Sequence, residues 1–190
     1  MEVVTKAGFV NDQTRYLRLI KQGALFIHPT DTIYGLGCDA TNKKAVAKIR
    51  EVKNRNNNPF SVIAPSKQWI LSHCEVSPAH NAWLDKLPGA YTLIFTLKNP
   101  ACIAPNVNPA KQTLGVRIPD HWFSQAVQQL GRPVITTSAN KTGQDFMNSL
   151  ETLDPEIQRY TNFIVYEGKK QGKPSTVVDL TTKKPVVLRG

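Results

Sequence analysis

The stretch Ala24–Gly37, ALFIHPTDTIYGLG, joins an apolar run to a polar loop that contains glycine. The apolar residues over 24–28 predict a short strand that ends at Pro29, because proline does not continue the hydrogen bonding of a strand. The threonines, the aspartate and the backbone N–H groups that follow could bind a polar ligand where the strand ends. A simple turn explains the same residues equally well. The stretch contains neither a Walker A loop nor a GxGxxG fingerprint.

Short apolar runs alternate with helical patterns through the rest of the chain. Helices are expected over 43–52, 66–73, 121–130 and 150–160. Strands are expected over 60–64, 91–97, 115–118, 133–137, 163–166, 176–180 and 186–188. This alternation predicts an α/β fold with a mixed sheet. No segment has the composition of a linker, so we expect a single domain over residues 1–190, with its longest loop at 99–112.

The charge of the chain favours an anionic partner. Its 190 residues include 24 Lys and Arg against 14 Asp and Glu, a formal net charge of +10 that excludes an acidic calcium-buffer protein. Three widely spaced cysteines argue against a disulfide scaffold or a zinc cluster and for reduced thiols. No apolar run approaches the ~20 residues that cross a bilayer, and no signal peptide is recognised, so we expect a cytoplasmic protein without a membrane partner.

Two cationic segments are candidate anion sites. In KNRNNNP, residues 53–59, Lys53 and Arg55 end a predicted helix and could converge on one phosphate. Cations at a helix C-terminus are also favourable for dipole reasons alone. In TLGVR, residues 113–117, Thr113 and Arg117 face the same side of a predicted strand. Arg117 needs an anionic partner there, either a ligand or an ordinary salt bridge across the sheet.

Polar residues also stand at the ends of later strands. TTSAN, residues 136–140, follows an apolar run, and Asn140 has the donors and acceptor that suit a purine edge or a ribose. Ser175 precedes one predicted strand and Arg189 ends the last one. A turn and a solvated arginine are the simpler explanations. Taken together, the hydroxyls and cations at strand ends suit a triphosphate, because ligands of open α/β sheets bind there.

Six motifs in this order resemble the YrdC/TsaC family, the threonylcarbamoyl-AMP synthases. They span nearly the whole chain: PTDTIYGLG at 29–37, Lys53-x-Arg55, VRIPDH at 116–121, Ser138-Ala139-Asn140, STVVD at 175–179 and Leu188-Arg189. The resemblance implies a twisted, mostly open sheet with a large basic concave groove. It also implies synthesis of L-threonylcarbamoyl-AMP from L-threonine, bicarbonate or CO2, and ATP, with release of pyrophosphate.

The resemblance further implies where the product goes and what the enzyme needs. A partner complex would transfer the threonylcarbamoyl group to an adenosine of tRNAs that read codons beginning with A. Direct contact with tRNA is a further expectation. Magnesium would come bound to ATP, because the sequence shows no carboxylate cage and no cluster of metal ligands.

The resemblance assigns roles residue by residue. Lys53, Arg55, Ser138 and Asn140 would carry catalysis at the phosphates. ATP would be held by Arg55, Asn58, Thr113, Ser138 and Arg189. Threonine would be held by Thr32, Arg117, Thr136 and Ser175.

The chain departs from the family pattern at three places. The segment after Arg55 is about one residue short and lacks the usual proline. Ile63 stands where several relatives have a histidine that meets threonine, and His28 stands where a tyrosine or an apolar residue is commoner. Two other functions stay open: an RNA-binding module without catalysis, and a related carbamoyl-transfer enzyme.

Overall fold

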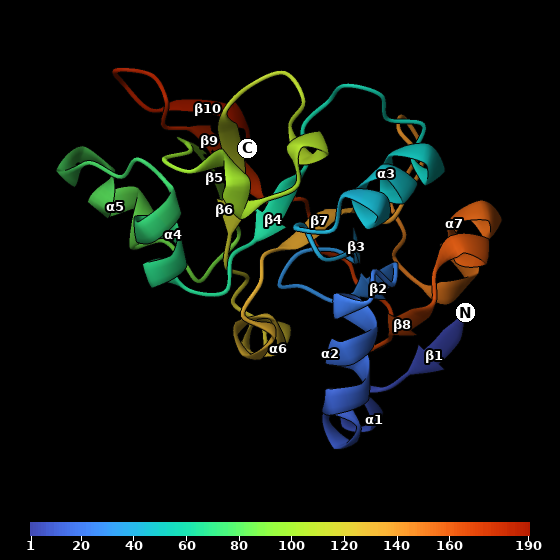
Figure 1. The fold of residues 1–190 in the computed structure, drawn as a ribbon. Coiled ribbons are helices and arrows are strands. Elements are labelled where there is room, and N and C mark those ends of the chain that lie inside the picture. The colour runs from blue at the N-terminus through green and yellow to red at the C-terminus, as the bar shows by residue number, and fades with distance from the viewer.

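One continuous ten-stranded sheet organises the computed structural model, which describes residues 1–190 (Figure 1). The strand order is β1-β8-β2-β3-β7-β4-β6-β5-β9-β10. The strands are β1 Glu2–Val4, β2 Phe26–His28, β3 Gly35–Gly37, β4 Ser61–Ile63, β5 Tyr91–Thr96, β6 Thr113–Arg117, β7 Val134–Ser138, β8 Phe163–Val165, β9 Thr176–Asp179 and β10 Val186–Arg189. The helices are α1 Lys6–Asn11, α2 Gln13–Lys21, α3 Lys43–Val52, α4 Lys67–His73, α5 Asn81–Leu84, α6 Phe123–Leu130 and α7 Pro155–Tyr160.

The sheet is mixed, which confirms the predicted fold class. β8 pairs in parallel with β1 and β2, β4 with β6, and β5 with β9. The remaining neighbours are antiparallel: β2 with β3, β3 with β7, β7 with β4, β6 with β5, and β9 with β10. The central strands β3, β7 and β4 therefore bring together segments that lie far apart in the sequence.

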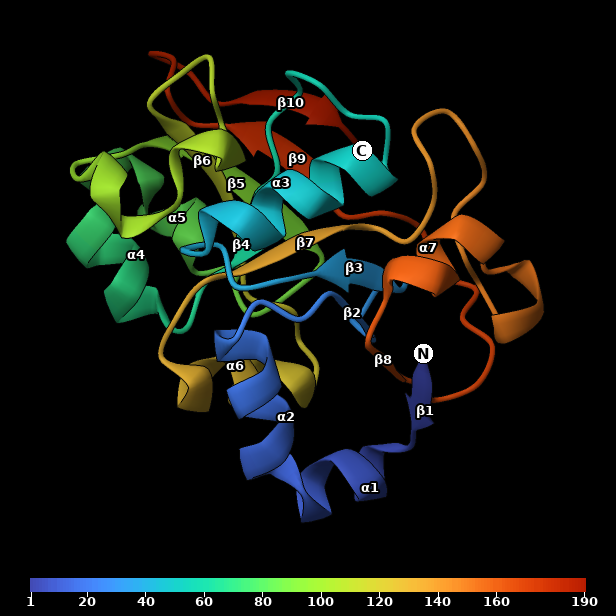
Figure 2. The same ribbon diagram turned by 45° about the vertical axis from the view of Figure 1, so that its right-hand side comes forward.

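Helices cover the sheet from two sides, and each side has its own core. Figure 2 shows α1, α2 and α6 below the central strands β2, β3 and β7, and α3 above those three strands. The lower core includes six aromatic side chains: Phe9, Tyr16, Phe26, Phe123, Phe163 and, half-buried, Trp122. The upper core takes the apolar face of α3, with Val46 and Ile49 fully buried. The strands between the two cores are consequently held on both faces.

Local capping residues set several helix ends as the sequence predicts. The Ser66 hydroxyl accepts a hydrogen bond of 3.0 Å from the Trp69 N–H and so caps α4. Gly131 ends α6 in the left-handed region, with φ of 70°. The predicted helix over 150–160 is wrong in its extent, because Asp154 and Pro155 begin a new helix, α7, after a short 3-10 turn at Leu150–Thr152.

The strand β3 was expected to be loop. Two of its three residues are glycines, which are depleted in strands, so the local signal for it is weak. Glycine is required by close packing. A Cβ on Gly35 would lie 2.8 Å from the His28 ring, and one on Gly37 would lie 2.7 Å from the Ile135 carbonyl oxygen.

The cysteines and the lengths of the helices complete the description of the fold. All three cysteines are free thiols, and burial raises the pKa of Cys74 to about 12. None of the helices is both long enough and apolar enough to cross a membrane.

Candidate active site

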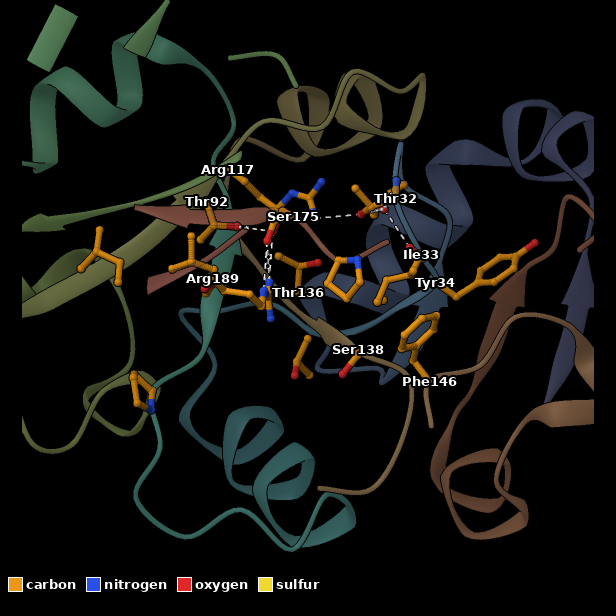
Figure 3. A pocket seen from close by; sticks show the side chains of 18 of the residues that line it. Thr32, Ile33, Tyr34, Thr92, Arg117, Thr136, Ser138, Phe146, Ser175 and Arg189 are labelled. Atoms are coloured by element: carbon orange, nitrogen blue, oxygen red, sulfur yellow. Dashed lines mark hydrogen bonds between the residues drawn. The ribbon is translucent and has the colours of Figure 1, made fainter. Parts of the chain in front are cut away.

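A cavity of about 320 Å³ is lined by residues of β3, β4, β5, β6, β7, β9 and β10 and of the loops beside them (Figure 3). Most of the residues predicted to form the site line it: Thr32, Arg55, Arg117, Thr136, Ser138, Ser175 and Arg189. The other four, Lys53, Asn58, Thr113 and Asn140, do not line it. The sheet topology therefore gathers residues from all six sequence motifs around one space.

The loop after β2 is shaped by its own threonines. The Thr30 hydroxyl donates to the Ile33 carbonyl oxygen at 2.7 Å and accepts from the Thr32 N–H at 3.1 Å. The hydroxyls of Thr30 and Thr32 are themselves 2.9 Å apart. These bonds fix the turn that the sequence suggested, and they also bring Thr32 to the cavity wall.

Arg117 forms the buried cationic wall of the cavity. Its Nη2 pairs with Oδ1 of Asp31, and its Nη1 donates to the Thr32 hydroxyl at 3.3 Å. The second oxygen of Asp31 accepts from the Asp120 N–H at 3.0 Å. The salt bridge considered from the sequence is thus present, yet the buried Nε of Arg117 has no partner. Burial lowers the pKa of Arg117, and the charge of Asp31 opposes that effect.

Ser175 and Arg189 line the cavity beside Arg117. The Ser175 hydroxyl lies 2.8 Å from the Thr92 hydroxyl, and Arg189 Nη2 donates to the Ser175 carbonyl oxygen at 2.8 Å. Figure 3 shows these three side chains together next to Arg117. Arg189 is exposed, as expected of a terminal arginine, and its bonds to the Ser175 carbonyl oxygen also hold it at the start of β9.

Lys53 lies behind the cavity wall. It is 2% exposed, and its Nζ donates to the carbonyl oxygens of Ser138 and Asn140 and to Oδ1 of Asn140. The Ser138 hydroxyl donates to the same Oδ1. Burial, with the charge of Arg55, lowers the pKa of Lys53 to about 7, while three oxygen acceptors match the three N–H groups of its charged form. Lys53 therefore holds the Ser138–Asn140 turn in place.

Arg55 reaches the cavity from the segment after α3. Its Nη2 donates to the Pro59 carbonyl oxygen at 2.6 Å, and its guanidinium lies 4.9 Å from the centre of the Phe60 ring. Asn58 is exposed beside it. β4 and β6 are parallel with Ser61 opposite Gly115, and extending this register places Thr113 next to Pro59. Asn58 and Thr113 thus lie on the side of Arg55 without lining the cavity, and the Thr113 hydroxyl accepts a hydrogen bond of 3.1 Å from the Asn108 amide.

Several lining residues were not singled out from the sequence: Ile33, Tyr34, Ser61, Thr92, Ile94 and Phe146. Tyr34 was part of the first motif, but nothing in the sequence marks Thr92 or Phe146, which enter through sheet pairing and a turn. Ile63 is fully buried and does not line the cavity. His28 lies beneath the floor, and burial lowers its pKa to about 3, so it is neutral there.

The lining suits an anionic and polar ligand. Arg55, Arg117 and Arg189 all reach the cavity, and no aspartate or glutamate is among the residues that line it. The structure contains no group of three or more His, Cys, Asp or Glu side chains that could hold a metal ion. The cavity thus offers charge neutralisation and hydroxyl donors rather than metal ligands.

Comparison with known proteins identifies the family. The family model described as "Telomere recombination", of the Sua5/YciO/YrdC proteins, matches residues 18–190. The chain belongs to this family. A relative from Methanocaldococcus jannaschii is 33% identical over 173 residues, which cover 90% of this chain and 81% of the relative. The threonylcarbamoyl-AMP synthase of Bacillus subtilis is 32% identical over 90% of this chain, which spans 51% of that longer protein.

A solved structure with the same fold contains L-threonine. The crystal structure of P. abyssi Sua5 complexed with L-threonine superposes with a TM-score of 0.84 and 27% identity. The match covers 99% of this chain and 56% of that chain. The twisted α/β fold expected from the resemblance is therefore confirmed.

Proposed function

We propose that this chain is an L-threonylcarbamoyl-AMP synthase, which joins L-threonine, bicarbonate or CO2, and ATP and releases pyrophosphate. The observation that carries the proposal is the convergence of three arginines and several hydroxyls on one cavity free of carboxylates. Relatives that match most of this chain have the name of that enzyme, and a Sua5 structure of the same fold contains L-threonine.

Threonine would occupy the buried end of the cavity. Thr32, Thr136 and Ser175 present hydroxyls there, and Arg117 would pair with the threonine carboxylate. Arg117 lines the cavity, so the threonine carboxylate would be its second anionic partner beside Asp31.

ATP would occupy the end formed by Arg55, Ser138 and Arg189, with Asn58 and Thr113 at the rim. The guanidinium groups would neutralise phosphate charge as it shifts in the transition state. Lys53 and Asn140 would act on the phosphates through Ser138, whose turn they hold. Magnesium would arrive on the triphosphate, since the lining has no carboxylate to hold it.

The chemistry then depends on positioning. The neutral amine of threonine adds to CO2 and loses a proton, which gives a carbamate. A carbamate oxygen attacks the α-phosphorus of ATP, and the bond to the bridging oxygen breaks so that pyrophosphate leaves. Holding the carbamate in line with that bond is the main contribution of the protein.

The mixed anhydride would be used by another protein. We place the reaction in the cytoplasm, where a threonylcarbamoyl-transferase complex would move the group to tRNAs that read codons beginning with A. Surface cations such as Lys43 and Lys44 would contribute to any direct contact with tRNA.

Pyrophosphate release from ATP, with and without threonine and bicarbonate, tests the proposal. Release should require all three substrates. Arg55→Ala should lower turnover about 100-fold or more, because it removes a phosphate-neutralising group. Arg18→Ala removes the same charge from an exposed site on α2 and should leave turnover unchanged. A wild-type protein without threonine-dependent release would overturn the enzyme and favour the RNA-binding alternative.

A further inference from the structure

The segment that places Arg55 has little local reason to hold its shape. Residues 54–58 read Asn-Arg-Asn-Asn-Asn, without a proline, and Asn54 stands in the left-handed region with φ of 50°. Residues 56–59 are exposed. Such a chain would sample many conformations unless other groups restrain it.

One guanidinium, that of Arg50 in the last turn of α3, supplies the restraint. Its Nη1 donates to the carbonyl oxygens of Arg55, Asn56 and Asn58 at 3.0, 2.9 and 3.2 Å. Its Nε and Nη2 donate to the carbonyl oxygens of Asn106 and Val107 at 2.7 and 3.1 Å. Arg50 thus binds five backbone oxygens and ties the 54–58 segment to a second loop.

The charge of Arg50 is left without a carboxylate partner. It forms no salt bridge, and its guanidinium lies 4.7 Å from the centre of the Phe60 ring, the ring that Arg55 also contacts. Two uncompensated cations therefore share one buried ring at the same end of the cavity. Burial is the main cause that lowers the pKa of Arg55, and repulsion from the charge of Arg50 lowers it further. An anion bound at Arg55 would relieve that repulsion.

We infer that Arg50 is a positioning residue for the nucleotide, which holds the 54–58 segment in the form that presents Arg55 and Asn58 to the triphosphate. The inference rests on the proposed function for the identity of the ligand. Arg50 touches none of the cavity itself, so it acts through the segment and not on the reacting atoms.

Amide hydrogen exchange on the intact protein tests the restraint without any substrate. Arg50→Ala should accelerate exchange at residues 54–60, while Arg18→Ala should not. Arg50→Lys is the second variant, because an ammonium has donors but cannot span both loops as the planar guanidinium does. It should fall between the wild type and Arg50→Ala. Unchanged exchange at 54–60 in Arg50→Ala would overturn the restraint.

Steady-state kinetics then test the positioning role. Arg50→Ala should raise the KM for ATP about tenfold and leave the KM for threonine unchanged, since only the nucleotide end is loosened. A variant that merely unfolds more easily would lower the active fraction and leave both KM values as they are. Faster exchange with an unchanged KM for ATP would overturn the role in nucleotide binding. A wild type without pyrophosphate release would overturn the proposed function, while the exchange data still decide whether Arg50 holds the segment.

Discussion

The two ends of the cavity are built in different ways. At the threonine end, buried side chains bond to one another: the Arg117 side chain is 7% exposed and pairs with Asp31, which is 12% exposed. At the nucleotide end, an exposed segment is held by its backbone carbonyl oxygens, mainly through Arg50. The first end owes its shape to the core, and the second owes its shape mainly to Arg50, with two further bonds from Arg55 to the Asn58 and Pro59 carbonyl oxygens.

This difference suits the two ligands. Threonine is small, and rejecting similar amino acids needs fixed groups around it. A triphosphate is recognised chiefly by charge, so a segment that can adjust around it loses little. The comparison predicts that substitutions at the buried end harm folding and binding together, whereas those at the exposed end harm nucleotide binding alone.

The largest effect should come from Arg117→Ala, which breaks the buried end. It leaves the Asp31 carboxylate buried without its cation, at a cost of about 3–5 kcal/mol in unfolding free energy. Threonine-dependent turnover should be lost as well. Urea unfolding and pyrophosphate release measure the two effects.

Arg132→Ala is the matched control for that change. Arg132 pairs with the buried Asp39, yet its own side chain is 46% exposed, and Thr41 gives Asp39 two further hydrogen bonds. Its loss should destabilise the protein much less and leave the KM for threonine unchanged. Equal kinetic damage in both variants would contradict the assignment of Arg117.

Lys53→Met should have the next largest effect, at the junction between the two ends. The Ser138 and Asn140 oxygens would lose their shared donor, and the kcat for pyrophosphate release should fall about 100-fold. Lys44→Met, at an exposed position of α3, the helix that Lys53 caps, should change neither kcat nor folding. Full activity of Lys53→Met would mean that the turn keeps its shape unaided.

His28 lies beneath the buried end of the cavity, and His28→Phe should change how the stability of the protein depends on pH. The pKa of His28 is about 3 in the folded protein and near 6.5 in the unfolded chain. The unfolded state therefore binds an extra proton below pH 6.5, and stability falls as the pH is lowered from there towards 3.

Between pH 7 and pH 5 this one group costs the wild type about 2 kcal/mol of unfolding free energy. His28→Phe preserves the ring that stacks on Phe123 and should lose that much less over the same range. Denaturant unfolding at both pH values measures it. Parallel losses in the two proteins would place the acid sensitivity elsewhere.

The smallest effect should come from Thr113→Val, which tests how far the nucleotide site extends at the exposed end. Removing one hydroxyl at the rim should raise the KM for ATP about threefold, the value of a modest hydrogen bond. Thr96→Val, directly opposite on β5, changes a residue that lines a different pocket, with Glu75 and Thr181, and should leave the KM for ATP unchanged. An unchanged KM for ATP in Thr113→Val would mean that the nucleotide site includes Arg55 but does not extend to Thr113.

The sequence predicted the parts of the site that each strand presents locally. Thr32, Arg117, Ser138 and Ser175 were chosen because hydroxyls or a cation stood at the end of an apolar run, and the mixed sheet does bring them together. Their roles towards threonine and ATP came from the family resemblance and stay predictions.

The sequence does not show which residues far apart along the chain contact each other in the fold. Asp31 lies 86 residues from Arg117, and Lys53 lies 85 from Ser138, so no local pattern pairs them. The strand β3 was missed because two of its residues are glycines, which have low strand propensity. They are required there by close packing against His28 and Ile135, which the sequence does not show. No local sequence pattern marks Arg50, and only the folded loops reveal its five acceptors.

One further contact links the two walls of the threonine end. A Cβ on Gly172 would lie 2.0 Å from the Thr32 carbonyl oxygen, so the segment leading to Ser175 crosses the first loop with no room for any side chain. Gly172 has no functional group, yet even an alanine there would push Thr32 and Ser175 apart. In a saturation mutagenesis screen, this silent position should tolerate as few replacements as Arg117. The need for no side chain at Gly172 should thus restrict substitution as strongly as the need for a charge at Arg117 does.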